Sequence, residues 1–279
     1  MISALQRQEN GTIELTITIP LDVVKKTWDD VVDNAVKNAE VSGFRKGMAP
    51  KHLVEEKLDK TKVKEEVLKK LLPQYYIEAI KEQNINPIIS PQIHVEKLED
   101  LSLETKDWKF TALTCEAPKV DLNGYKEKIK ALTAKSKIIV PGKEKQEVRF
   151  EEIVKTLIDS TKVEVPEILL ESEVNRLLAQ TLDEIKRLGL TLDQYLLTSK
   201  KTPESLRKEY REKARTDITL EFALQKISKD EKITVEEKEI EEAIQRAKDP
   251  NERKNMENNR YLLANIIRQQ KTLDFLKSL

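Results

Sequence analysis

The chain has 279 residues, enough for two domains, and its 36% charged and 38% hydrophobic residues differ from the about 25% and 45–50% of typical globular domains. A compact enzyme of this length needs more apolar residues, so we expect helices with much solvated surface and an elongated shape. The charges of the 50 basic and 50 acidic residues cancel, so the protein as a whole has no net positive charge that would attract nucleic acid. The one cysteine excludes a disulfide framework and a zinc site with several cysteine ligands.

The first predicted elements are a strand and a helix. Apolar and polar residues alternate over residues 13–19, which predicts a half-buried strand that ends at Pro20. A helix with one apolar face follows from Leu21 to Val36. We expect Gly43 to end this helix through a left-handed cap.

The next segment predicts two helices and two strands. Pro50 stands at a favoured first position of a helix, and a helical apolar stripe runs over residues 63–80. Pro73 is expected to kink that helix or to mark its restart. The sequence then returns to strand character around His94 and again around Cys115.

From Leu122 onward the strand signals vanish and the pattern becomes helical. We therefore predict an α+β domain over residues 1–120 and an all-α domain over residues 121–279. Residues 130–147 are interpreted as a linker within the second domain.

The helical part has clear start and stop signals. An apolar stripe over residues 170–188 is closed by Gly189, and further helices are expected around residues 206–224 and 262–273. Capping boxes are predicted from the spacing of Thr191 with Gln194 and of Thr234 with Glu237, and proline-headed helix starts at Thr202-Pro203 and Asp249-Pro250.

No catalytic or cofactor motif is recognised. The glycines form neither of the two common phosphate-binding patterns, so no nucleotide cofactor is expected. His52 and His94 lack partners at metal-ligand spacing, and Cys115 in an apolar segment is interpreted as a small buried hydrophobe. No signal peptide and no apolar run of about 20 residues is visible, so we expect a cytoplasmic protein without a membrane partner.

The stretch VSGFRKGMAPKHL, residues 41–53, places an aromatic and two cations between two glycines. It can be a connection between two helices, because Gly43 and Gly47 permit sharp bends. It can also be a binding site, because an exposed aromatic beside arginine is typical of interaction hot spots. From the residues alone both interpretations stay open.

The segment SGFRKGMAP resembles the ribosome-docking signature of the trigger factor family of bacterial chaperones. EAPKVDLNGYKEKIK is similar to the family's ribosome-binding domain, and VEVPEILLESEVNRLL to its helical chaperone domain. The resemblance implies that Phe44, Arg45 and Lys46 contact a large-subunit protein and nearby rRNA at the exit tunnel, with Gly43 and Gly47 shaping the turn. Met48 departs from the pattern, since the family usually has Lys there.

A second departure is the middle of the chain. Family members typically carry an FKBP-like prolyl isomerase domain there, but only residues 130–164 separate the two matched segments. This is too short for a domain with its own core, which usually needs more than about 40 residues. The resemblance therefore implies a trigger factor form without isomerase activity.

The implied function is ATP-independent holding of nascent or unfolded polypeptides during protein folding, with the chain docked at the ribosome. Family members can also form homodimers away from the ribosome. Three alternatives stay open: a folding factor with residual prolyl isomerase activity, a helical adaptor without ribosome binding, and a periplasmic chaperone with a similar helical domain.

Overall fold

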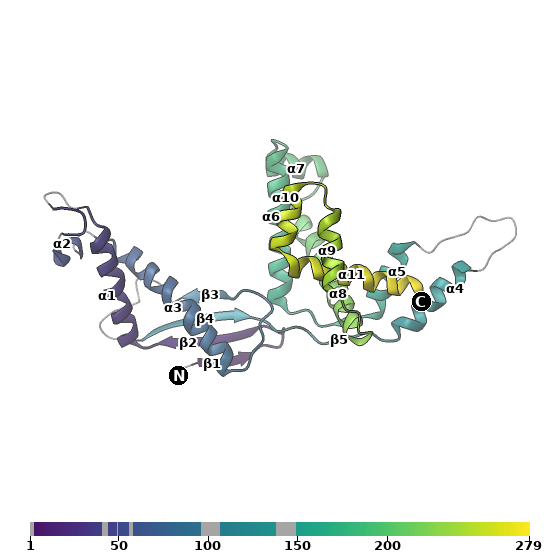
Figure 1. Ribbon diagram of the computed structural model, residues 1–279, viewed down its shortest axis with the longest axis horizontal. Coiled ribbons are helices and arrows are strands. Elements are labelled where there is room, and N and C mark those ends of the chain that lie inside the picture. Colours follow the sequence, from purple (N-terminus) through teal and green to yellow (C-terminus); the bar gives the residue numbers. More distant parts are fainter. Residues whose placement is uncertain (1–2, 41–43, 49, 56–57, 96–106, 138–148) are drawn as a thin grey trace. The chain divides into compact units, whose positions relative to one another are not determined.

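The computed structural model describes residues 3–40, 44–48, 50–55, 58–95, 107–137 and 149–279. The chain divides into two compact units. The first is Met1–Ala117 with Pro166–Leu169, and the second is Pro118–Val165 with Leu170–Leu279. The first unit combines a sheet with helices and the second is almost entirely helical, which confirms the predicted fold classes (Figure 1).

A four-stranded antiparallel sheet with the order β1-β2-β4-β3 forms the base of the N-terminal unit. Its strands are β1 (Ser3–Arg7), β2 (Ile13–Ile19), β3 (Gln92–Val95) and β4 (Trp108–Thr114). The sequence does not predict β1, because SALQR shows little apolar alternation. This strand forms by pairing with β2 along its whole length.

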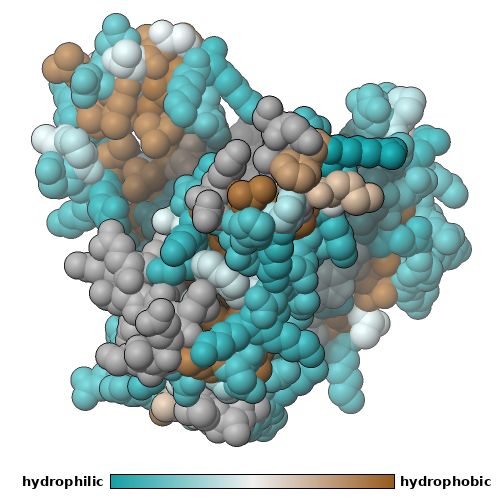
Figure 2. Space-filling model, turned by 90° about the vertical axis from the view of Figure 1, so that its left-hand side faces the viewer, coloured by the Kyte–Doolittle hydropathy of each residue, from teal (hydrophilic) through white to brown (hydrophobic). Residues whose placement is uncertain are grey.

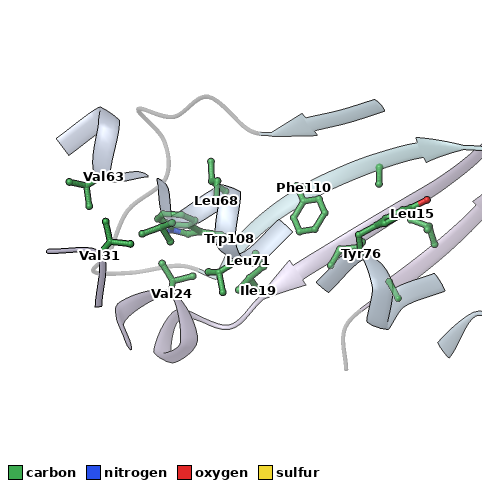
Figure 3. Packing of buried hydrophobic residues seen from close by; sticks show 14 of the residues in the cluster. Leu15, Ile19, Val24, Val31, Val63, Leu68, Leu71, Tyr76, Trp108 and Phe110 are labelled. Carbon is green, nitrogen blue, oxygen red and sulfur yellow. The ribbon is translucent and has the colours of Figure 1, made fainter. Parts of the chain in front are cut away.

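Three helices accompany this sheet: α1 (Leu21–Asn38), α2 (Lys51–Glu55) and α3 (Lys60–Glu82). The core lies between the sheet and the helices α1 and α3 (Figure 3). Leu15 and Trp108 contribute from the sheet, Val24 from α1 and Val67 from α3, and each is almost completely buried. This core joins the sheet to α1 and α3.

Two helix ends differ from expectation. α1 ends at Asn38, and its capping residue Ala39 has extended backbone angles. The prediction that Gly43 ends the helix is therefore wrong, and Gly43 itself lies outside the described residues. α3 continues through Pro73, so no helix restarts at that proline.

The second unit begins with the two-residue strand β5 (Val120–Asp121), which pairs with β6 (Lys162–Val163). β6 corrects the expectation that strands are absent after Leu122. The described helices of this unit are α4 (Tyr125–Lys137), α5 (Phe150–Ser160), α6 (Glu167–Arg187), α7 (Leu192–Ser199), α8 (Pro203–Asp230), α9 (Glu237–Arg246), α10 (Pro250–Asn258) and α11 (Arg260–Ser278).

Among the described residues, apolar clusters hold helices of this unit together. Ile129 of α4, Leu157 of α5, Ile227 of α8 and Leu276 of α11 are fully buried in one cluster. A smaller cluster joins α9, α10 and α11 around residues 240–267. Apolar side chains of α6 and α8 outside these clusters are buried as well, among them Leu170, Val174 and Leu206.

Polar contacts connect α6 with α8. The Glu171 carboxylate pairs with both Arg207 and Arg211. The hydroxyl groups of Thr181 and Tyr210 lie 2.6 Å apart. These contacts link the two helices at two points along α6, at Glu171 and at Thr181.

The linker interpretation of residues 130–147 is wrong for its first part. Residues 130–137 belong to α4, and Thr133 is buried. Residues 138–148 lie outside the described residues. Packing of α4 against α5 and α11, which the local sequence does not report, explains the difference.

Most predicted caps are confirmed. Thr191 and Gln194 form a capping box, and Thr202 and Asp249 cap proline-headed helices. The predicted box of Thr234 with Glu237 is wrong, because the backbone N–H of Glu236 donates to the Glu239 carboxylate instead, at 2.8 Å.

Candidate functional site

The candidate site is the turn between α1 and α2, which we call the 44–48 turn. The structure describes its residues Phe44, Arg45, Lys46, Gly47 and Met48, whereas Gly43 lies outside the described residues.

Backbone hydrogen bonds hold the turn against the end of α1. The Gly47 N–H donates to the Ala39 carbonyl at 3.1 Å, and the Met48 N–H donates to the Arg45 carbonyl at 2.9 Å. The second bond closes a four-residue β-turn over residues 45–48. Gly47, with φ of +76°, stands at the third position, where a type II turn requires a positive φ.

Gly47 is needed for a second reason. A Cβ atom at this position would lie 2.6 Å from the carbonyl oxygen of Lys37 in α1. Backbone atoms of a helix cannot move away cheaply, so any larger residue would push the turn off the helix. The sharp bend that the sequence predicts at Gly47 is therefore confirmed.

Phe44, Arg45 and Lys46 are all exposed residues. The Phe44 residue is 44% exposed, and Arg45 and Lys46 are also exposed. Lys46 lies 3.6 Å from Glu40, but both side chains are mostly exposed, so this ion pair contributes only about 0–1 kcal/mol. Arg45 makes no ion pair with any residue that the structure describes. Both cations are thus available to a partner.

Lys51 ties the far side of the turn to α1. Its Nζ lies 2.9 Å from an oxygen of Asp33, 3.8 Å from Asp29 and 3.9 Å from Glu55. The hydrogen bond with Asp33 raises the pKa of Lys51 above its ordinary value. Val54 of α2 is buried. The turn is therefore anchored on both sides.

Figure 2 faces the end of the molecule that lies at the left in Figure 1, where α2 and the end of α1 are found. Its nearer surface is mainly hydrophilic, with small hydrophobic areas among the polar side chains. A site here offers a few apolar side chains within a hydrophilic surface.

The remaining predicted candidates do not form a site. His52 and His94 are exposed and lie in different elements, α2 and β3. Cys115 is fully buried, and burial raises the pKa of its thiol to about 11, which agrees with the interpretation as a small buried hydrophobe. Among the described residues no group of acidic, histidine and cysteine side chains could hold a metal ion.

The second unit exposes several apolar side chains, some of which, such as Leu188 and Leu262, lie in the same predicted apolar stripes as buried residues. Leu188 and Leu197 are 74% and 79% exposed on the α6–α7 segment. On α11, Leu262 and Ile266 are exposed while Leu263 is buried. A groove of about 410 Å³ beside them is lined by Met256 and polar residues of α10. The i,i+4 spacing of Leu262 and Ile266 is the signal that could have marked this second face.

Family models match both halves of the chain. The model described as bacterial trigger factor protein matches residues 1–157, and the model of the bacterial trigger factor C-terminus matches residues 125–278. Each match covers more than half of the 279 residues.

Curated relatives match part of the chain. The trigger factor of Staphylococcus epidermidis is 33% identical over 126 residues, which is 45% of this chain and 28% of the relative. The trigger factor of Macrococcus caseolyticus is 33% identical over 121 residues, 43% of this chain and 27% of the relative. The aligned part of the chain thus spans less than a third of these relatives' length.

A solved structure has the same fold. It comes from work titled "Promiscuous Substrate Recognition in Folding and Assembly Activities of the Trigger Factor Chaperone". The TM-score is 0.66 at 14% identity, over 100% of this chain and 99% of that chain.

No described helix is both long enough and apolar enough to pass through a lipid bilayer.

Proposed function

The chain belongs to the trigger factor family, and from this premise we propose that it is an ATP-independent chaperone that docks at the ribosomal exit tunnel and holds unfolded polypeptides. The observation that carries the proposal is the exposed and anchored 44–48 turn, within the part of the chain that the N-terminal family model matches.

The turn suits docking on a surface of protein and RNA. Phe44 can fill an apolar pocket, because the residue is exposed next to the hydrogen-bonded turn over residues 45–48. Arg45 and Lys46 can meet acidic side chains or phosphates of the large subunit and nearby rRNA. Docking brings the helical unit close to emerging chains, so weak contacts are used at a high local concentration.

The helical unit suits holding. The exposed side chains of Leu188, Leu197, Leu262 and Ile266 offer separate apolar contacts to nascent or unfolded polypeptides. Each contact is weak and non-directional, so binding and release need no nucleotide. Unrelated unfolded chains can therefore be bound.

We further propose that the chain has no prolyl isomerase activity. α4 and α5 occupy the middle of the chain, and both contribute side chains to the same core as α8 and α11. Only residues 138–148 lie between them, fewer than the about 40 residues that a domain without disulfides or metal ions needs.

The proposed location is the cytoplasm. We also propose that the protein forms a homodimer when it is not bound to the ribosome.

The experiment is co-sedimentation with ribosomes over a salt series. We expect the variant with Phe44, Arg45 and Lys46 replaced by Ala to lose binding by at least about thirtyfold, since hot-spot truncations cost 2 kcal/mol or more. A matched control replaces Lys70, Ile77 and Lys81, also one exposed apolar and two exposed basic side chains, on α3. If the turn variant pellets with ribosomes as well as the control does, the docking proposal is wrong.

A further inference from the structure

Met48 is an unusually exposed apolar residue of the N-terminal unit. Its residue is 71% exposed, against 46% for Ile77 and 41% for Ile88 in the same unit. A single exposed apolar side chain is ordinary on protein surfaces. Here, however, two of them, Phe44 and Met48, lie within one short turn and flank two cations.

The backbone fixes where Met48 lies relative to the other turn residues. The bond from the Met48 N–H to the Arg45 carbonyl makes these two residues the ends of one β-turn, whose Cα atoms lie within about 7 Å. The bond from the Gly47 N–H to Ala39 holds this turn on the end of α1. The backbone of Met48 is therefore held by a hydrogen bond while its side chain is exposed to a partner.

We infer that Met48 is a further contact residue of the turn, which packs against an apolar area on a protein of the large ribosomal subunit. This inference rests on the proposed docking function. We place Met48 against protein because an uncharged thioether gains nothing from a phosphate, whereas its flexible chain adapts to an irregular apolar surface of side chains. Docking then has two apolar contacts, Phe44 and Met48, and two charged ones, Arg45 and Lys46.

This division of contacts predicts a specific salt dependence. Ions do not screen apolar contacts. Each lysine contact to a phosphate, in contrast, makes the negative slope of log affinity against log salt steeper by about 0.7–0.9. Removal of Met48 must therefore weaken docking at every salt concentration without changing the slope.

The test is co-sedimentation of Met48→Ala, Met48→Leu and Met48→Lys with ribosomes across a salt series. We expect Met48→Ala to bind about three- to tenfold more weakly at all salts, and Met48→Leu to bind like the wild type. Met48→Lys should bind with a steeper slope than the wild type. Ile77→Ala, an exposed apolar truncation on α3, should change nothing.

The outcomes separate this inference from the docking proposal. If Met48→Ala binds within twofold of the wild type while the Phe44, Arg45 and Lys46 variant does not bind, the inference about Met48 is wrong and docking stands. If that triple variant also binds normally, the docking proposal itself fails. The circular dichroism spectrum of each variant should match that of the wild type, so that a loss of ribosome binding reflects the missing contact and not unfolding.

Discussion

The two units differ in how they expose apolar residues. The N-terminal unit buries most of its apolar side chains in one cluster between the sheet, α1 and α3, and exposes a few, among them Phe44 and Met48 of the turn. The second unit has smaller clusters and leaves leucine and isoleucine side chains exposed on α6, α7 and α11. A rigid base suits one specific contact, whereas scattered apolar side chains suit many weak ones. Four predictions test this comparison.

The largest effect is expected from core truncation. Trp108→Ala should lower the free energy of unfolding of the N-terminal unit by about 3–5 kcal/mol, because the side chain is almost fully buried. Ile227→Ala should cost the second unit about 2–5 kcal/mol. Hydrogen exchange, read separately for each unit, measures both. Loss of ribosome docking in Ile227→Ala but not in Trp108→Ala would contradict the division of roles.

The second prediction concerns alkaline pH. Burial raises the pKa of the Cys115 thiol from 9.0 to about 11, so the folded state keeps the thiol neutral after the unfolded state has ionised. The stabilisation is present below pH 9 and is lost as pH rises to about 11, by at most about 2–3 kcal/mol.

Cys115→Ala removes this titration, so its urea midpoint should fall less between pH 8 and pH 10.5 than the wild-type midpoint does. Tyr75 and Tyr76, whose pKa values are also raised by burial, are present in both proteins, so the comparison with wild type removes most of their contribution. Equal pH dependence in both proteins would show that the thiol is not buried in solution.

The third prediction compares two glycines with similar backbone angles. Gly47→Ala should destabilise the N-terminal unit by about 1–2 kcal/mol and reduce ribosome affinity at least about tenfold, because the new Cβ would clash with the Lys37 carbonyl. Gly189→Ala has the same positive φ strain but no atom within 4 Å of its Cβ. It should leave docking unchanged. Thermal unfolding and ribosome co-sedimentation measure the pair.

The smallest stability effect is expected on the exposed face of α11. Leu262→Ser with Ile266→Ser should change the free energy of unfolding by less than about 0.5 kcal/mol per site, yet weaken suppression of aggregation of an unfolded test protein. Leu263→Ser, at a buried position, should instead destabilise the unit. If the double variant suppresses aggregation as well as the wild type does, Leu262 and Ile266 do not contact unfolded polypeptides.

Sequence reasoning located the candidate turn but not all of its geometry. The glycine spacing and the exposed Phe44 follow from the local sequence, and the positive φ of Gly47 agrees with them. The contact of Gly47 with Lys37 and the pairing of Lys51 with Asp33 depend on how α1 and α2 meet. Such contacts are set by packing between elements, which no local pattern reports.

Local chemistry in the sequence alone determined the alternating strand over residues 13–19 and the helix starts at Thr191, Thr202 and Asp249, because each depends on residues within one turn or one strand. Only the tertiary structure decided that residues 3–7 form a strand, because the partner β2 supplies the hydrogen bonds that their weak pattern does not predict. It also decided that Leu263 is buried while its neighbour Leu262 is exposed. Both leucines belong to one apolar stripe, and only packing against α9 and α10 selects which one enters the core.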